Sequence, residues 1–261
     1  MKSYIIHFLR HGSIDETLSG KYIGTTDVPL SDKGKIELRK LDYEYRYPGC
    51  QAVFTSPLKR CTQTCKILYP EQNPLVIANL SECNFGEWEG KTANDLNEDE
   101  DFQKWLAGDP SVKPPRGESN ADFTRRICKM FESIVEGLIK TGTTESVIVT
   151  HGGVIMTLLA VYGMPQAKPF EWVMDNGFGY SVRITPQLWQ RDKIMEVFSV
   201  IPEKKDIEDF WRNFDAISGD IQNYIRNWAD IRYYNYYRFM PNKFGNDTSE
   251  ILDAIKRSNV D

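Results

Sequence analysis

One pattern recurs three times in this sequence and constrains the fold more than any other feature. A short apolar run is followed by polar or glycine residues and then by a helical segment; the runs lie at Tyr4–Leu9, Ala52–Thr55 and Val147–Val149. The first run leads into Arg-His-Gly at residues 10–12, and the third leads into Thr-His-Gly-Gly at residues 150–153. Short apolar runs that alternate with helices indicate buried strands of a mostly parallel sheet.

The remaining segments continue this alternation. The predicted helices are one that begins at Ser31, one at Leu58–Tyr69, a polar one that includes Phe102 and Trp105, one at Ala121–Lys140 and one that reaches Tyr162; the further predicted strands are Val76–Leu80, Tyr180–Ile184 and Met195–Ile201. We therefore predict an α/β fold with three layers, α/β/α, around a mostly parallel central sheet over residues 1–202. The right-handed crossover rule places the strand ends on one edge, so Arg10, His11 and His151 can meet.

The sequence changes character after Pro202, where we expect the sheet to close. Apolar residues recur at three-and-four spacing from Ile207 to Ile231, which predicts an amphipathic helical extension over residues 203–261. Its apolar stripe is expected to dock on the domain or to form a homodimer. The alternative is that tyrosine and arginine side chains of residues 226–238 stack on nucleic acid.

Net charge and cysteine usage narrow the classes of partner. A net charge of −5 argues against general binding to nucleic acid but is compatible with a local site for small anions. The five cysteines include no CxxC pair and no secretory leader precedes them, which favours a cytoplasmic protein with reduced thiols. Cys61 and Cys65 would share a helical face, yet no nearby Cys or His completes a set of metal ligands. The run Tyr4–Leu9 is too short to span a membrane.

Five short motifs carry the chemistry. A lone Arg-His-Gly tripeptide is a weak signal, because a histidine at a strand end is more often structural than catalytic. Four further motifs follow it in order, and chance does not easily supply all five. They are Ser56–Arg60, Glu82 with Phe85–Gly90, Gly117–Ser119 and Thr150–Gly153.

With these motifs the chain resembles the histidine phosphatase superfamily, and within it the phosphoglycerate mutase-like branch, from about residue 2 to residue 202. The segment Gly20–Ser31 looks like a loop of that branch. The chain resembles the α-ribazole phosphatases in particular at Trp105, Asp109-Pro110 and Pro115–Ser119. The resemblance implies phosphoryl transfer with no metal and no cofactor.

The resemblance also implies a role for individual residues. His11 would be the nucleophile, whose neutral imidazole attacks phosphorus and forms a phosphohistidine, and its other ring nitrogen should donate to a backbone carbonyl. Arg10 and Arg60 would clamp phosphoryl oxygens with forked donors, and His151 would be a third donor as an imidazolium. Glu82 would protonate the leaving oxygen and then deprotonate water, a role that predicts a raised pKa.

Backbone groups and hydroxyls are expected to complete the phosphate site. Gly24 and Gly152 would let the main chain approach the phosphate closely, and Thr17 and Thr25 could add hydroxyl donors. The branch often carries Glu or Asp where this chain has Ser13, and Asn where it has Thr17. This departure leaves mutase chemistry and the orientation of the substrate open.

Five other residues have competing interpretations. Glu87 and Glu89 are rivals of Glu82 for the acid role. His7 lies two residues inside a strand and is expected to pack in the core. Trp88 and Trp105 could line the pocket for the leaving group or pack in the core, and the sequence leaves both alternatives open.

The sequence thus predicts a metal-independent phosphomonoesterase that acts through a phosphohistidine on a small phosphorylated metabolite. The candidate substrate is a nucleoside phosphate of the cobalamin pathway, α-ribazole 5'-phosphate. The alternatives are a phosphoglycerate mutase or broad sugar-phosphate phosphatase of the same superfamily, and a non-catalytic protein that binds phosphate ligands. A mutase needs a deep pocket with several cations, whereas Asp95–Gly108 is rich in Asp and Glu, which favours hydrolysis. A binding protein would have lost His11, an arginine or His151, and all are present.

Overall fold

The computed structural model describes residues 2–109 and 111–205. A compact unit ends at Lys204. From residue 206 on, the predicted helical extension lies outside the described residues, so its docking, homodimer and nucleic-acid alternatives remain predictions. In the described part of the chain, no helix combines the length and the apolar character that crossing a membrane requires.

A seven-stranded mixed sheet forms the centre of the fold, in the order β4-β3-β5-β1-β7-β8-β6. The strands are β1 (Tyr4–Arg10), β3 (Ala52–Thr55), β4 (Leu75–Val76), β5 (Glu145–Thr150), β6 (Gly163–Met164), β7 (Gly179–Ile184) and β8 (Met195–Ile201). The four strands from β4 to β1 are mutually parallel, and β7 runs antiparallel to both β1 and β8. The predicted mostly parallel sheet is therefore confirmed.

Residues of the sequence cap the ends of some of the helices. They are α1 (Asp32–Glu44), α2 (Lys59–Leu68), α3 (Glu100–Leu106), α4 (Asn120–Thr141), α5 (Gly152–Tyr162) and α6 (Pro186–Asp192). The Ser31 hydroxyl accepts from the Gly34 N–H at the start of α1, and Ser119 caps α4 in the same way. Gly142 ends α4 in the left-handed conformation, where a glycine carries no steric penalty.

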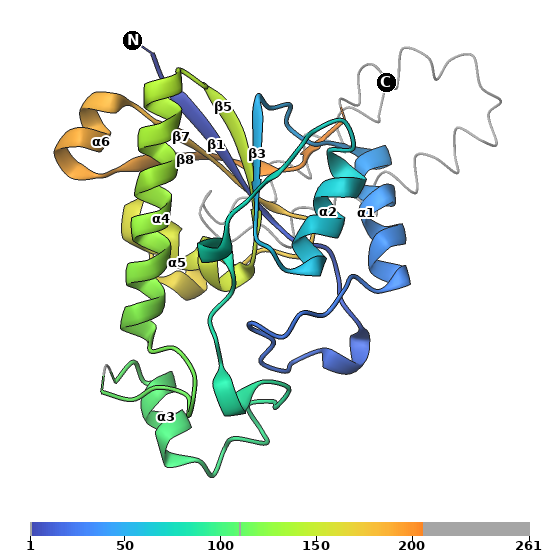
Figure 1. Ribbon diagram of the computed structural model, residues 1–261, viewed down its shortest axis with the longest axis vertical. Coiled ribbons are helices and arrows are strands. Elements are labelled where there is room, and N and C mark those ends of the chain that lie inside the picture. The colour runs from blue at the N-terminus through green and yellow to red at the C-terminus, as the bar shows by residue number, and fades with distance from the viewer. Residues whose placement is uncertain (1, 110, 206–261) are drawn as a thin grey trace, which may run out of the picture. The chain divides into compact units, whose positions relative to one another are not determined.

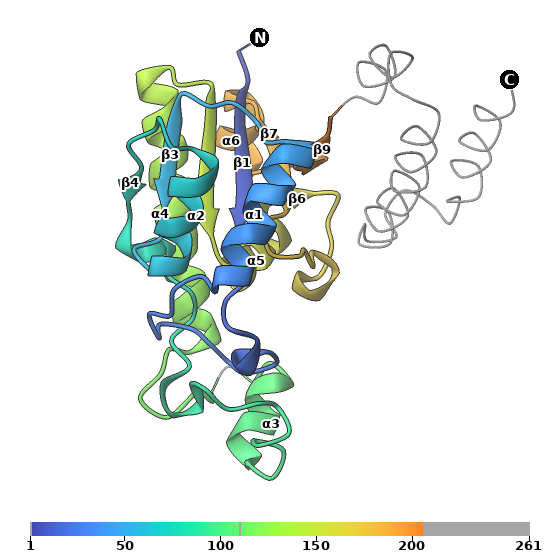
Figure 2. The same cartoon turned by 90° about the vertical axis from the view of Figure 1, so that its right-hand side faces the viewer.

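Two apolar cores fill the space between the sheet and the helices, one on each face of the sheet. Ile6, Phe8 and Ile148 pack with residues of α4 and α5. Leu9 and Val147 project the other way and pack with residues of α1 and α2. This alternation along β1 and β5 is the period of a strand, and it produces the three predicted layers (Figures 1 and 2).

A third, smaller cluster lies away from the sheet around α3 (Figure 1). Trp88 and Phe102 form its buried centre with Leu96, and Trp105 packs against them with its ring 5.5 Å from that of Trp88. The core alternative is therefore confirmed for Trp88. His7 is also buried, as predicted, and its Nδ1 lies 2.7 Å from the Ser181 hydroxyl.

One sequence prediction at a strand end was wrong, and another was confirmed. The strand expected at Val76–Leu80 is reduced to β4 and is followed by a 3-10 turn at Ala78–Leu80, because its partner β3 ends at Thr55 and offers no further pairing. The chain also continues to pair beyond Pro202. There β9 (Glu203–Lys204) forms a separate antiparallel pair with β2 (Tyr45–Arg46). The central sheet itself ends with β8 at Ile201, so the prediction that Pro202 closes it is confirmed.

The larger core yields a stability prediction at Phe131, which is fully buried between the rings of Phe8, Tyr162 and Trp189. We expect Phe131→Ala to lower the free energy of unfolding by about 3–5 kcal/mol, through lost burial and a residual cavity. Glu136→Ala, at an exposed position of the same helix, should change it by less than about 0.5 kcal/mol. Urea unfolding followed by circular dichroism measures both, and equal midpoints would contradict this account of the core.

Candidate active site

The adjacent parallel strands β1 and β5 bring two histidines together. His11 follows the last residue of β1 and His151 follows the last residue of β5, at the same edge of the sheet (Figure 1). The His11 N–H donates to the Thr150 carbonyl at 3.0 Å, which continues the ladder by one bond. The two imidazole ring centroids lie 5.2 Å apart. The expectation that these residues meet is confirmed.

His11 is held as a neutral imidazole with one ring nitrogen available. Its Nδ1 lies 2.8 Å from the Gly12 carbonyl oxygen, and a carbonyl only accepts, so Nδ1 carries the proton as predicted. Within residues 2–109 and 111–205, Nε2 has no hydrogen-bond partner and keeps its lone pair. Burial, with Arg60 and then Arg10 nearby, lowers the pKa of His11 to about 3. A neutral imidazole with a free Nε2 is the form that can attack an electrophile.

Asn176 fixes the loop that carries this histidine. Its amide Nδ2 donates to the His11 carbonyl at 2.8 Å and to the Gly12 carbonyl at 3.3 Å. The Thr64 hydroxyl accepts from the Gly12 N–H at 3.0 Å. No sequence motif pointed to Asn176, because it lies in an irregular segment far along the chain and only the tertiary fold brings it here.

Arg60, the second residue of α2, has all three of its guanidinium nitrogens engaged. Nη1 donates to the Thr26 carbonyl at 2.9 Å, Nη2 donates to the Gly24 carbonyl at 2.6 Å, and Nε donates to His151 Nδ1 at 3.2 Å. The arginine is 1% exposed. The loop at residues 24–26 therefore fixes the plane of the guanidinium before any ligand binds.

Glu89 in turn fixes that loop. Its carboxylate accepts from the backbone N–H groups of Gly24, Thr25 and Thr26, and from the Thr26 hydroxyl. A β-carbon at Gly24 would overlap the Cys83 carbonyl and this carboxylate, so the approach requires glycine. Glu89, one of the rivals of Glu82 for the acid role, is thus bound to backbone donors. The other rival, Glu87, is exposed and lies 3.3 Å from Arg116.

His151 is neutral in this geometry. Because Nδ1 accepts from Arg60, the ring proton is on Nε2, which donates to the Ser56 hydroxyl at 2.8 Å. Burial first, then His11 and Arg60, holds its pKa well below the ordinary value. The imidazolium expected from the sequence is therefore not the form that these contacts support in the absence of a substrate. Protonation at Nδ1 would require the bond from Arg60 to break.

Arg10 has one buried donor without a partner in the described part of the chain. Its Nη1 donates to the Met174 carbonyl at 2.6 Å, whereas Nε is buried and makes no hydrogen bond there. An unsatisfied buried donor on a cation is costly, so this nitrogen is suited to an anionic ligand. A β-carbon at Gly152 would be in ordinary contact with the same guanidinium.

Glu82 faces the same space as a buried carboxyl group. Its oxygens accept from the Cys83 N–H at 3.0 Å and from the Gly153 N–H at 2.9 Å. Burial outweighs these bonds and the two arginines and raises the pKa of Glu82, in the predicted direction. A β-carbon at Gly153 would overlap this carboxylate. The direction of this shift favours the protonated form of Glu82, which a proton donor requires.

A cavity of about 560 Å³ opens over these groups. Of the predicted site residues, its lining includes Arg10, His11, Arg60, Glu82 and Gly152. His151 is not in the lining but lies behind Arg60 in contact with it.

The predicted donors Thr17, Gly24 and Thr25 do not line this cavity. The Thr17 N–H and hydroxyl both bind Asp15, while the N–H groups of Gly24 and Thr25 bind Glu89. Trp88 and Trp105 are not in the lining either. Across the residues that the structure describes, no group of three or more His, Cys, Asp or Glu side chains is arranged to hold a metal ion.

The burial of the histidines predicts their titration. The chain has three histidines, and the pKa of each is lowered, to about 3 for His11. As the pH falls through the ordinary value, the folded protein should therefore leave His11 and His151 uncharged although an unfolded chain would protonate them. We expect NMR of ¹⁵N-histidine-labelled protein without substrate to show neither ring charging down to pH 5. A midpoint near 6.5 for either ring would contradict the neutral site.

Comparison with known proteins agrees with this geometry. The chain is 27% identical over 174 residues to the adenosylcobalamin/alpha-ribazole phosphatase of Salmonella typhimurium, covering 65% of this chain and 85% of the relative. It is 26% identical to a 2,3-bisphosphoglycerate-dependent phosphoglycerate mutase of Bifidobacterium longum, covering 67% and 88%. The crystal structure of the alpha-ribazole phosphatase from Shigella flexneri has the same fold, with a TM-score of 0.63 at 24% identity over 76% of this chain and 96% of that one. Residues 6–196 match the family described as the histidine phosphatase superfamily, branch 1, and the chain, as a phosphatase or mutase, belongs to it.

Proposed function

We propose that this protein hydrolyses a small phosphomonoester without a metal, through a phosphohistidine on His11. The observation that carries the proposal is the free Nε2 of a neutral His11 in a cavity that Arg10, Arg60 and Glu82 also line. Phosphoryl transfer needs a nucleophile, cations around the phosphoryl oxygens and an acid for the leaving oxygen. The lining supplies one candidate for each requirement.

In the first step, His11 Nε2 forms a bond to phosphorus while the bond from phosphorus to the ester oxygen breaks. The Arg10 Nε–H and the Arg60 guanidinium stabilise the charge on the equatorial oxygens. Glu82, whose pKa is raised by burial, gives its proton to the leaving oxygen, so the alcohol departs neutral. The enzyme then holds a phosphohistidine and an ionised Glu82.

In the second step, the Glu82 carboxylate takes a proton from water while the water oxygen attacks phosphorus. The bond from phosphorus to Nε2 breaks, and inorganic phosphate leaves. His11 returns to its neutral form because Nδ1 keeps its proton against the Gly12 carbonyl throughout. Glu82 is protonated again, which completes the cycle.

The other charges of the lining favour hydrolysis over a mutase reaction. A mutase must retain a bisphosphorylated intermediate, which requires further cations. Beyond the site residues, the lining has Lys21 and Lys33 against Asp15, Glu16 and Glu37. Lys33 is paired with Glu16. These five side chains carry a net negative charge, which supports a substrate with a single phosphoryl group.

The apolar part of the lining supports a leaving group with a flat or hydrophobic portion. It is formed by Ile14, Leu18, Ile23, Met156, Val173 and Met174. A nucleoside 5'-phosphate presents such a surface, whereas a phosphoglycerate presents a second anion. Together with the likeness to the Salmonella phosphatase, this supports α-ribazole 5'-phosphate as the substrate, and hence a role for the protein in cobalamin synthesis in the cytoplasm.

Loss of the nucleophile tests the covalent mechanism. In EDTA, the wild type should release phosphate from phosphomonoesters, and His11→Ala should lower kcat by at least about a thousand-fold because the covalent route is lost. Acid-labile ³²P should become bound to the wild type and not to the variant. Activity that disappears in EDTA and returns with a divalent cation would contradict the metal-free mechanism.

The second prediction concerns the leaving group. Across α-ribazole 5'-phosphate, 3-phosphoglycerate and sugar phosphates, kcat/KM should be highest for the nucleoside phosphate, because the lining offers apolar contact and no surplus of cations. Formation of 2-phosphoglycerate from 3-phosphoglycerate with added 2,3-bisphosphoglycerate measures the mutase alternative. Isomerisation faster than phosphate release would contradict the hydrolase proposal and support a mutase.

A further inference from the structure

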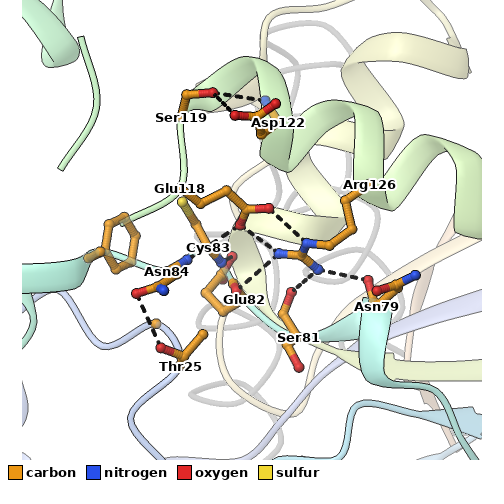
Figure 3. Close-up of polar contacts among 12 residues, drawn as sticks. Thr25, Asn79, Ser81, Glu82, Cys83, Asn84, Glu118, Ser119, Asp122 and Arg126 are labelled. Atoms are coloured by element: carbon orange, nitrogen blue, oxygen red, sulfur yellow. Dashed lines mark hydrogen bonds and ion pairs between the residues drawn. The ribbon is translucent and has the colours of Figure 1, made fainter. Parts of the chain in front are cut away.

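Arg126 and Glu118 form a half-buried, two-pronged ion pair beside the segment that carries Glu82. Arg126 Nε donates to Glu118 Oε1 and Nη2 donates to Oε2, each at 2.8 Å. Arg126 lies on α4, and Glu118 lies just before that helix. Figure 3 shows the guanidinium between this carboxylate and the chain at Asn79 and Ser81. Parallel bonds of this kind fix the guanidinium plane as well as its position.

The same guanidinium binds three carbonyl groups of the segment that carries the acid. Nη1 donates to the Asn79 carbonyl at 2.9 Å and to the Ser81 carbonyl at 3.1 Å, and Nη2 donates to the carbonyl of Glu82 itself at 3.3 Å. One side chain thus binds the main-chain oxygens on both sides of the Glu82 Cα atom. All three guanidinium nitrogens are used in these contacts.

Glu118 binds the same segment from its other end. Its backbone N–H donates to the Asn84 carbonyl at 2.8 Å, and its Oε2 accepts from the Asn84 N–H at 3.5 Å. Residues 82–85 belong to neither a helix nor a strand, so no ladder of backbone bonds fixes them. The ion pair therefore supplies side-chain bonds where the sheet supplies none.

We propose that Arg126, held by Glu118, is a positioning residue that keeps the Glu82 carboxyl group within reach of the leaving oxygen. The inference rests on the proposed function, in which Glu82 is the proton donor. Arg126 is not in the lining of the cavity over His11, so it acts through the backbone of Glu82 and not on the substrate. A misplacement of the acid by about 1 Å can lower a rate by about 100-fold.

The loss of activity caused by removing Arg126 should depend on the leaving group of the substrate. This dependence distinguishes a positioning role from a general structural role. An alkoxide needs a proton as it departs, whereas p-nitrophenolate is a weak base and departs without one. The ratio kcat/KM includes only steps up to release of the alcohol. It therefore reports proton donation to the leaving oxygen and is insensitive to the later attack of water.

The experiment compares kcat/KM for the best alkyl phosphomonoester of the panel with kcat/KM for p-nitrophenyl phosphate. Glu82→Gln sets the scale, with an expected loss of about 100- to 10,000-fold on the alkyl ester and little loss on the aryl ester. We expect Arg126→Ala and Glu118→Gln to lower kcat/KM on the alkyl ester by about 10- to 100-fold and on the aryl ester by less than about 3-fold. The matched control is Arg125→Ala, whose exposed side chain binds Asp122 on the same helix. It should leave both values unchanged.

A pH profile gives a second readout. Burial raises the pKa of Glu82, and a carboxyl group released toward water loses that effect. The alkaline limb of kcat/KM for the alkyl ester should therefore move to lower pH in Arg126→Ala. If this variant does not fold, as judged by circular dichroism, Arg126→Lys replaces it, because lysine keeps the charge but cannot bind carboxylate and carbonyls together.

The outcomes separate the two proposals. Equal losses on both esters, or no loss on either, would overturn the positioning role while Glu82→Gln still supports the acid role. A wild type that releases phosphate from neither ester would overturn the proposed function and this inference with it. A loss confined to the alkyl ester, together with the shifted alkaline limb, supports the positioning role.

Discussion

The parallel pairing of β1 with β5 is the constraint on which the rest of the site depends. It ends two strands at one edge, so that residues 140 positions apart in the chain face each other. Both imidazoles are buried at this edge, and burial is what keeps the rings uncharged. Reactivity here is therefore a consequence of sheet register: a slip by one residue would turn His11 to the opposite face.

Three carboxylates near the cavity have two different tasks, and their hydrogen-bond partners decide which task each one has. Glu82 accepts only two backbone bonds and remains buried, so it can keep a proton. Glu89 is bound to a series of backbone N–H groups, and Glu118 is bound to an arginine. Both of these serve as anions that order the main chain. Two arginines link these ordered main-chain segments to the reacting groups. Arg60 binds the Gly24 carbonyl and lines the cavity, and Arg126 binds the Glu82 carbonyl.

The sequence was informative where the signal was local and silent where contacts were distant. Apolar periodicity located the strands and most helices, since burial on one face imposes a period on the chain. The resemblance pointed to His11, Arg60 and Glu82, which line the cavity. The partner of the Gly24 N–H could not be predicted, because no sequence pattern reveals that Glu89 binds it. Asn176 was missed for the same reason: its partners come from the other end of the chain.

The two glycines after His151 are not equivalent, although they look alike in the sequence. A methyl group at Gly152 would rest at ordinary contact distance against an arginine, whereas one at Gly153 would occupy the volume of the Glu82 carboxylate. Gly153 therefore supports the acid directly, because it leaves space for the carboxylate and donates its N–H to it. A survey of natural variants that considers only ionisable side chains would overlook Gly153. At this position even a change to alanine would displace the proton donor.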